Sequence, residues 1–222
     1  MDSKLSVIVV TSPARSHPST FLLDSVLKSF DLVQGLENAT ITIIFDHYFI
    51  CDKAQPKKGK VTAMMAENYE AYITATRAKY GEDKRFAFII CENHHGFAMC
   101  VKRGLESCVT KYCLVCQHDR AFMANIPGGL PQLLDTLERT EATRPLFAPI
   151  RYIGLPTSSS CHHDSLVRTR YRLDALLQPP LDVATGDKST VLRPLVFMYD
   201  SNHIAIVEEY LKIFQPYKNL PE

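Results

Sequence analysis

Short apolar runs alternate along this chain with longer stretches in which apolar residues recur every three or four positions. Continuous runs rich in β-branched residues predict strands buried on both faces, and the spaced pattern predicts amphipathic helices. The predicted strands are 5–10, 41–45, 86–91, 112–116, 146–153 and 195–199, and the predicted helices are 21–30, 63–80, 97–107, 130–140 and 204–214. This alternation predicts an α/β fold, a mixed, mostly parallel open sheet flanked by helices.

Turn and capping residues support several of these boundaries. Ser19 or Thr20 is suited to cap the first helix, and Gly81 directly follows the helix predicted at 63–80. The Lys-rich segment 50–62 is typical of a loop. The least regular region is 155–194, which is rich in Ser, Pro, His and Asp. A connection of that length is uncommon unless it has a function, so we expect a binding loop or a lid there.

The composition adds limits more than detail. A chain of 222 residues with 46% hydrophobic and 22% charged residues is typical of one soluble globular domain. A formal net charge of +1 gives no electrostatic reason to expect nucleic-acid binding. No apolar run approaches the roughly 20 residues needed for a transmembrane segment. The 7 cysteines, odd in number and in apolar contexts, favour reduced thiols and a cytoplasmic location over a disulfide framework.

Polar residues follow three of the predicted strands. Residues 11–15 come after the first strand, Asp46 after the second, and residues 117–120 after the fourth. Open α/β sheets bind ligands at the carboxyl ends of their strands. A nucleotide at that edge would meet one carboxylate able to accept from a base or ribose, and a second able to hold a cation against a diphosphate. Mg²⁺ and Mn²⁺ favour such oxygen ligands, and this makes Asp119 the most informative residue of the chain.

Residues 93–120 resemble the nucleotide-sugar-binding part of GT-A-fold glycosyltransferases, in particular the family 2 group. Gly104-Leu105 matches the Gly-hydrophobic pair of that family, Cys108 the small residue that follows, and Tyr112 the strand tyrosine. The segment 117–119, Gln-His-Asp, then coincides with the Asp-x-Asp motif without a gap.

The chain departs from the family pattern at three places. Gln117 occupies the first Asp position of the motif, and Lys102 stands where the family often has Asn. Residues 93–96 are one residue longer than the family's Asn-x-Gly. Metal binding would therefore depend on Asp119 with less help.

The resemblance implies a single GT-A-like domain, with 1–120 as the nucleotide-sugar-binding half and 121–222 as the acceptor-side half. It implies a metal-dependent glycosyltransferase that moves a sugar from a UDP- or GDP-sugar to an acceptor, which is a glycan, a lipid or a protein. Mn²⁺ or Mg²⁺ would be held by Asp119 and by His203, the latter similar in position to a histidine that completes the metal site in many such enzymes. The nucleotide-sugar-binding residues would be Thr11, Ser12, Arg15, Asp46, Arg103, Gln117 and His118, and the candidates for the catalytic base are Asp187 and Asp200.

Several of these residues have simpler interpretations. Asp46 could be a turn aspartate, Asp119 could pair with Arg120 or cap a helix, and Asp200 could cap the last helix with His203 in its first turn. Cys113 and Cys116, three apart in a strand, point to opposite faces and suit core packing. The histidine pairs at 94–95 and 162–163 lack the matched spacing of a zinc finger.

Two other functional classes stay open on the sequence alone. An inactive nucleotide-sugar-binding or scaffold protein is favoured by Gln117 and by the short acceptor-side half. A nucleotidyltransferase would share the need for a metal held by a carboxylate.

Overall fold

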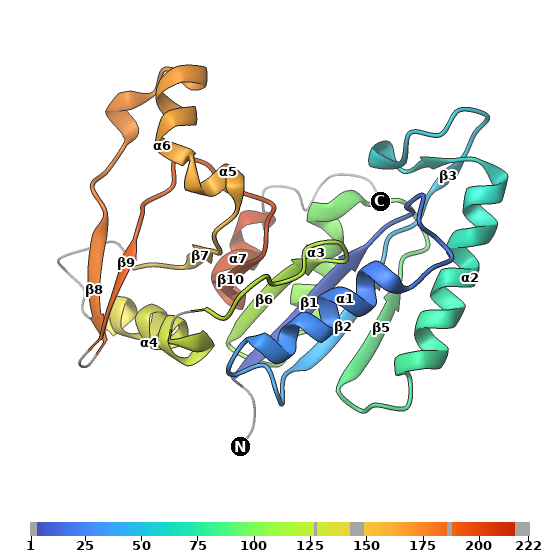
Figure 1. Ribbon diagram of the computed structural model, residues 1–222, viewed down its shortest axis with the longest axis horizontal. Helices are drawn as coiled ribbons and strands as arrows, with labels where there is room; N and C mark the ends of the chain where they lie inside the picture. The colour runs from blue at the N-terminus through green and yellow to red at the C-terminus, as the bar shows by residue number, and fades with distance from the viewer. Residues whose placement is uncertain (1–3, 127, 143–148, 186–187, 216–222) are drawn as a thin grey trace.

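Six strands form the central sheet of the computed structural model, which describes residues 4–126, 128–142, 149–185 and 188–215 (Figure 1). Their order across the sheet is β5-β2-β1-β6-β10-β7. The first four are parallel to one another, β10 is antiparallel to β6, and β7 is antiparallel to β10. Their bounds are β1 Leu5–Thr11, β2 Thr40–Phe45, β5 Phe86–Ile90, β6 Tyr112–Gln117, β7 Tyr152–Gly154 and β10 His203–Ile206. The predicted mixed, mostly parallel sheet is confirmed, and because it takes strands from both halves of the chain, the fold is one domain.

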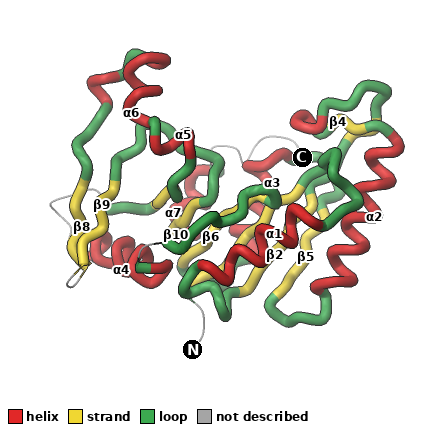
Figure 2. Tube along the Cα trace, viewed as in Figure 1, coloured by secondary structure: helices red, strands yellow, loops and turns green. Residues whose placement is uncertain are grey.

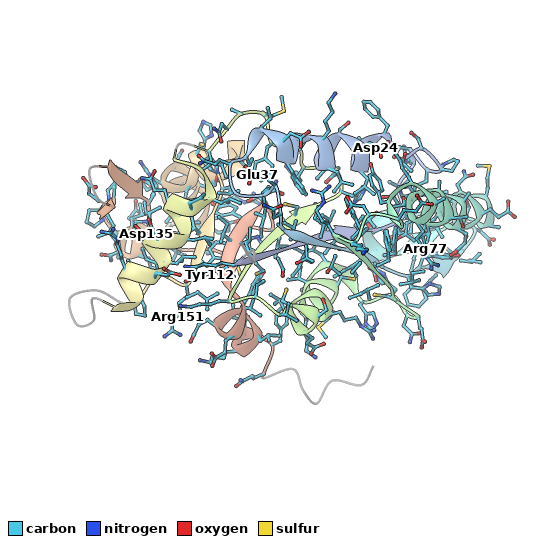
Figure 3. The ribbon with its side chains drawn as sticks, turned by 90° about the horizontal axis from the view of Figure 1, so that it is seen from below. Asp24, Glu37, Arg77, Tyr112, Asp135 and Arg151 are labelled. Carbon is cyan, nitrogen blue, oxygen red and sulfur yellow. The ribbon has the colours of Figure 1, made fainter. Side chains whose placement is uncertain are left out.

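Helices cover both faces of this sheet (Figure 3). Successive side chains of a strand point to opposite faces, so Val7 and Val9 of β1 belong to one core layer, and Ile8 and Val10 to the other. The first layer packs against α1, α2 and α4, and the second against α3 and α7. These helices are α1 Phe21–Ser29, α2 Ala63–Tyr80, α3 Gly96–Ser107, α4 Gly129–Ala142 and α7 Val207–Ile213.

Helix α3 lies close to the sheet because its contact residue is Gly104. A Cβ at this position would be 2.6 Å from Cγ2 of Ile8 and 2.8 Å from Cδ1 of Ile44. The absence of a side chain lets the helix backbone approach β1 and β2 directly. This close packing fixes the N-terminus of α3 beside the carboxyl end of β2.

The last strand of the sheet corrects two predictions. Residues 195–199 were expected to form a strand and 204–214 a helix, but the strand is β10 at His203–Ile206 and the helix is the shorter α7. Short apolar runs suit a strand or a buried helix equally. Pairing with β6 on one side and β7 on the other decides the conformation here.

The irregular region 155–194 extends away from the sheet as an arm (Figures 1 and 2). Its hairpin of β8 and β9 contacts α4 near one end of the molecule. The elements of the arm are α5 Ser158–Cys161, α6 His163–Leu166, the π-helix Val167–Tyr171, a 3-10 turn at Asp174–Leu176, β8 Leu181–Thr185 and β9 Lys188–Leu192. Of the strand predicted at 146–153, residues 146–148 lie outside the described part of the chain, and β7 forms its end.

The segment predicted as a Lys-rich loop contains short regular pieces, namely β3 Phe49–Ile50, a 3-10 turn at Pro56–Lys58 and β4 Lys60–Val61. All seven cysteines are free thiols. Cys113 and Cys116 lie in opposite core layers, as predicted. Across the described residues, the helices fall short of the length and hydrophobicity that crossing a membrane requires.

Candidate functional site at the carboxyl edge of the sheet

Hydrogen bonds join the predicted polar segments at one edge of the sheet. The backbone N–H of Asp46 donates to the carbonyl of Thr11 at 2.9 Å, and that of His118 donates to the carbonyl of Val10 at 3.1 Å. The segment that leads into β10 reaches the same edge, since Gln117 Nε2 donates to the carbonyl of Asp200 at 2.6 Å. The residues that follow β1, β2 and β6 therefore meet at the place where open α/β sheets bind ligands.

Asp46 holds the N-terminus of α3. Its side chain is 3% exposed, and Oδ1 accepts from the backbone N–H of His47 at 2.9 Å and of His95 at 2.8 Å. Oδ2 accepts from the N–H of Gly96 at 3.0 Å and lies 2.9 Å from Nδ1 of His94. A helix N-terminus has unpaired N–H groups and a positive dipole end, which a carboxylate satisfies. This corrects the prediction that Asp46 grips the nucleoside, because its carboxylate is buried and faces the N-terminus of α3.

Thr11 points into the core and not toward the edge. The residue is 1% exposed, its hydroxyl shares a hydrogen bond of 3.3 Å with the hydroxyl of Tyr72, and its carbonyl accepts from the hydroxyl of Tyr69. Its predicted contact with a nucleotide is therefore not supported. Ser12, half-buried, and Arg15, exposed, lie in the loop that follows β1.

Two neighbouring histidines lie at this edge, the buried His17 and the half-buried His118, and His17 was not predicted. His17 stacks on Tyr72 with 4.0 Å between ring centroids, and its ring lies 6.1 Å from that of His118. Burial is the main cause that lowers the pKa of His17 to about 4, and burial also lowers the pKa of His118, which the charge of Asp119 partly opposes. Both rings are therefore neutral at pH 7. His17 follows the first strand in the sequence, and this position was the signal that could have placed it at the edge.

Asp119 and Asp200 are exposed carboxylates that come from different segments of the edge. Asp119 lies in the turn that follows β6, and Asp200 in the bend that precedes β10. Gln117 links these segments through its bond to the Asp200 carbonyl, and Asn202 adds a second link by donating to the carbonyl of Arg120 at 2.8 Å. The amide at the first position of the Asp-x-Asp motif therefore has a structural partner, which no spacing in the sequence indicated.

His203 does not fit its predicted role as a metal ligand. It is fully buried at the start of β10, opposite Val115 of β6. Its Nδ1 lies 2.6 Å from the carbonyl of Ser201, and its Nε2 lies 3.0 Å from the hydroxyl of Tyr210. Burial lowers the pKa of His203 to about 4. Both nitrogens are engaged inside the core layer of α7, so this residue stabilises the fold and does not reach a cation at the edge.

Two predicted residues, Arg103 and Asp187, are not among the residues placed at this edge. Arg103 is half-buried on α3, near Cys91 at the end of β5. There its charge helps to lower the pKa of the Cys91 thiol, after the larger effect of a hydrogen bond with Cys100. Arg103 thus lies on the side of the edge away from β6. Asp187 falls outside the described residues.

The edge suits a cation that takes most of its ligands from substrate and water. Mg²⁺ typically uses one or two carboxylates plus phosphate oxygens, and the exposed Asp119 and Asp200 are of the right kind. Within the described ranges, the one group of three His, Cys, Asp or Glu side chains close enough to hold a metal is Asp46, Cys91 and Cys100. A complete protein cage at Asp119 is therefore absent from the described part of the chain.

Comparison with known proteins found no matching family model and no curated protein of similar sequence. Among solved structures, the fold is similar to 4-diphosphocytidyl-2C-methyl-D-erythritol synthase from Anaerococcus prevotii, at 12% identity and a TM-score of 0.48, over 96% of this chain and 74% of that one. It is similar to S. aureus TarS 1–349 at 11% identity and a TM-score of 0.48, over 93% and 47%. It is also similar to the mannosyltransferase PcManGT from Pyrobaculum calidifontis, solved with GDP-Man and Mn²⁺, at 10% identity and a TM-score of 0.42, over 78% and 39%. This chain thus spans about half the length of TarS 1–349 and less than half the length of the mannosyltransferase. These similarities concern the fold.

Proposed function

We propose that this protein transfers a sugar from a UDP- or GDP-sugar to an acceptor hydroxyl at the carboxyl edge of its sheet. The observation that carries the proposal is the exposed Asp119 at the end of β6, with Asp200 brought to the same edge by Gln117. This arrangement agrees with the resemblance of residues 93–120 to GT-A glycosyltransferases. An acidic side chain thus lies at the edge where open α/β sheets bind ligands, which supports the proposal.

The diphosphate of the donor binds away from α3. Helix N-termini are common phosphate sites, but Asp46 already accepts from the N–H groups of His95 and Gly96. The exposed guanidinium groups of Arg15 and Arg120 are the cations that follow β1 and β6. Mn²⁺ or Mg²⁺ held by Asp119 would neutralise the charge that develops on the departing nucleoside diphosphate.

Asp200 is our first candidate for the base that deprotonates the acceptor hydroxyl. A general base must lie within hydrogen-bonding reach of the proton that it removes. Asp200 is exposed, and the hydrogen bond from Gln117 to its carbonyl holds its segment at the carboxyl edge of the sheet. Asp187 remains the second candidate.

The proposal is tested by thermal shift with UDP- and GDP-sugars, with and without Mn²⁺. A ligand at about 100 times its Kd stabilises a protein by about 2.7 kcal/mol, which for this size raises Tm by about 5–10 °C. We expect Asp119→Asn to lose the Mn²⁺-dependent part of that shift. Asp52→Asn, an exposed aspartate in the β3–β4 segment, is the matched control and should keep it. An unchanged shift in Asp119→Asn would refute the site.

A turnover assay then separates the three functional classes. Release of the nucleoside diphosphate with sugar transfer or donor hydrolysis supports the transferase. Donor binding without any turnover identifies a nucleotide-sugar-binding protein. Consumption of a nucleoside triphosphate with release of pyrophosphate identifies a nucleotidyltransferase.

A further inference from the structure

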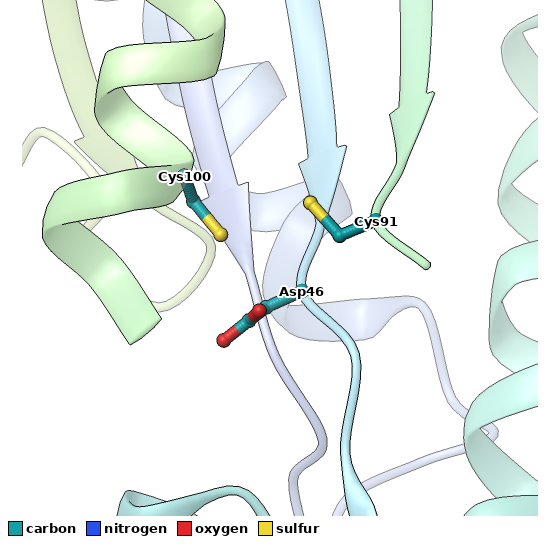
Figure 4. Close-up of side chains that lie close together, drawn as sticks. All are labelled: Asp46, Cys91 and Cys100. Atoms are coloured by element: carbon teal, nitrogen blue, oxygen red, sulfur yellow. The ribbon is translucent and has the colours of Figure 1, made fainter. Parts of the chain in front are cut away.

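Three buried side chains that could bind a metal converge beneath the edge of the sheet (Figure 4). Asp46 follows β2, Cys91 follows β5, and Cys100 belongs to the first turns of α3. Their exposures are 3%, 1% and 0%, and their ligand atoms all lie within 4.8 Å of one another. Neither thiol was among the residues predicted from the sequence to act as catalytic base, to bind the nucleotide-sugar or to bind a metal.

We propose that Asp46, Cys91 and Cys100 form a binding site for a single thiophilic divalent cation of the zinc class. In a tetrahedral zinc site the metal–sulfur distance is about 2.3 Å, which separates two sulfur ligands by about 3.8 Å. The ligand atoms here lie within 4.8 Å of one another, so small movements of the side chains would bring them to that spacing. Thiolate sulfur selects Zn²⁺ over Mn²⁺ and Mg²⁺, which prefer oxygen. This site is therefore distinct from the cation proposed at Asp119.

The surroundings hold Asp46 in place for such a role. Its carboxylate is oriented by the backbone N–H groups of His47, His95 and Gly96 and by the ring of His94. Ligands of protein-bound metals are commonly oriented by hydrogen bonds of this kind. The positive charge of Arg103 lies near Cys91 and would offset part of the negative charge of two thiolates and a carboxylate.

A cation bound to these three side chains would join three separate segments at the carboxyl edge of the sheet. It would link the ends of β2 and β5 to α3, whose position otherwise depends on Gly104 packing and on the Asp46 hydrogen bonds. The inference does not depend on the proposed transferase activity, since it concerns other side chains and another class of metal.

The test titrates Co²⁺, a spectroscopic substitute for Zn²⁺, into the reduced, chelator-treated full chain. We expect one Co²⁺ per chain, with a thiolate-to-cobalt charge-transfer band and the visible bands of tetrahedral cobalt. Cys91→Ser and Cys100→Ser should each lose at least half of the charge-transfer intensity, because each variant removes one of the two thiolates. Cys161→Ser, an exposed thiol, and Cys113→Ser, a thiol buried elsewhere in the core, are the matched controls and should keep it.

Two results would overturn the site. One is a wild-type protein with seven free thiols that shows no charge-transfer band. The other is a band that keeps its full intensity in Cys100→Ser but disappears in Cys161→Ser. Should a variant fail to fold, Zn²⁺ added to the wild-type protein provides a second measurement, with an expected rise in Tm of about 5 °C or more at saturation. No shift would contradict the proposal without any variant. A loss of donor binding in Asp119→Asn leaves these outcomes unchanged, so the two proposals fail separately.

Discussion

The buried imidazole of His203 should make this protein sensitive to mild acid. Its ring is fully buried, and its pKa is lowered from 6.5 to about 4, chiefly because burial disfavours the charged form. The unfolded chain therefore binds a proton at a higher pH than the folded chain does. Stability rises with pH wherever the unfolded state binds more protons. The contribution of His203 is thus complete above about pH 6.5 and is lost as the pH falls from there toward 4.

The size of the effect follows from the shift. One pKa unit corresponds to about 1.4 kcal/mol. The shift from 6.5 to about 4 therefore removes about 3 kcal/mol from the free energy of unfolding as the pH falls through this range. By pH 5 the loss is already about 2 kcal/mol. His17 has the same lowered pKa and should add a similar loss, so a variant is needed to isolate His203.

Urea unfolding of the wild type and of His203→Gln at pH 7 and pH 5 makes this measurement. Glutamine keeps an amide donor and acceptor near Ser201 and Tyr210 but does not titrate. The variant should therefore lose about 2 kcal/mol less than the wild type between the two pH values, whatever its stability at pH 7. His162→Gln, at an exposed position, is the control and should follow the wild type. Equal losses in the wild type and His203→Gln would refute this account of the buried ring.

Two substitutions test how α3 is held. Asp46→Asn turns one acceptor oxygen into a donor that faces the N–H of Gly96 or the ring of His94, so we expect urea unfolding to show a loss of about 2–4 kcal/mol. A loss below about 0.5 kcal/mol would contradict the capping role. Gly104→Ala places a methyl group 2.6 Å from Ile8, and the overpacking should exceed the helix-propensity gain and lower stability by about 1–2 kcal/mol. A more stable variant would show that α3 can move away from the sheet.

The sequence predicted those elements that local pattern determines and missed those that depend on distant partners. The parallel strands β1, β2 and β6 are buried apolar runs, and β5 is an apolar run at the partly exposed edge of the sheet. The type of all four follows from composition and length alone. β10 is as short as a single helical turn, and it is a strand because β6 and β7 supply its hydrogen bonds. The prediction of a helix from residue 204 therefore failed, and with it the expected position of His203.

The same limit applies to the candidate site. The sequence placed Asp46, His118 and Asp119 at one edge because the carboxyl ends of parallel strands coincide. It could not show that Asp46 already has donors at the start of α3, because these belong to residues 94–96, nearly fifty positions later. Burial of Thr11 depends likewise on Tyr69 and Tyr72 of α2. Which side chains stay free at an edge is thus a property of the tertiary structure.

Gln117 illustrates how a departure from a motif can be accommodated by the fold. A carboxylate at this position would face the carbonyl of Asp200, and two acceptors in contact repel each other. The amide instead donates to that carbonyl at 2.6 Å and draws the segment before β10 to the edge. That segment carries the exposed side chain of Asp200. The edge therefore has a carboxylate from the second half of the chain, although β6 ends in Gln117 and not in an aspartate. Since Asp46 also occupies the donors of the α3 N-terminus, we expect a diphosphate bound here to depend on a cation held by Asp119 and on the arginines at this edge.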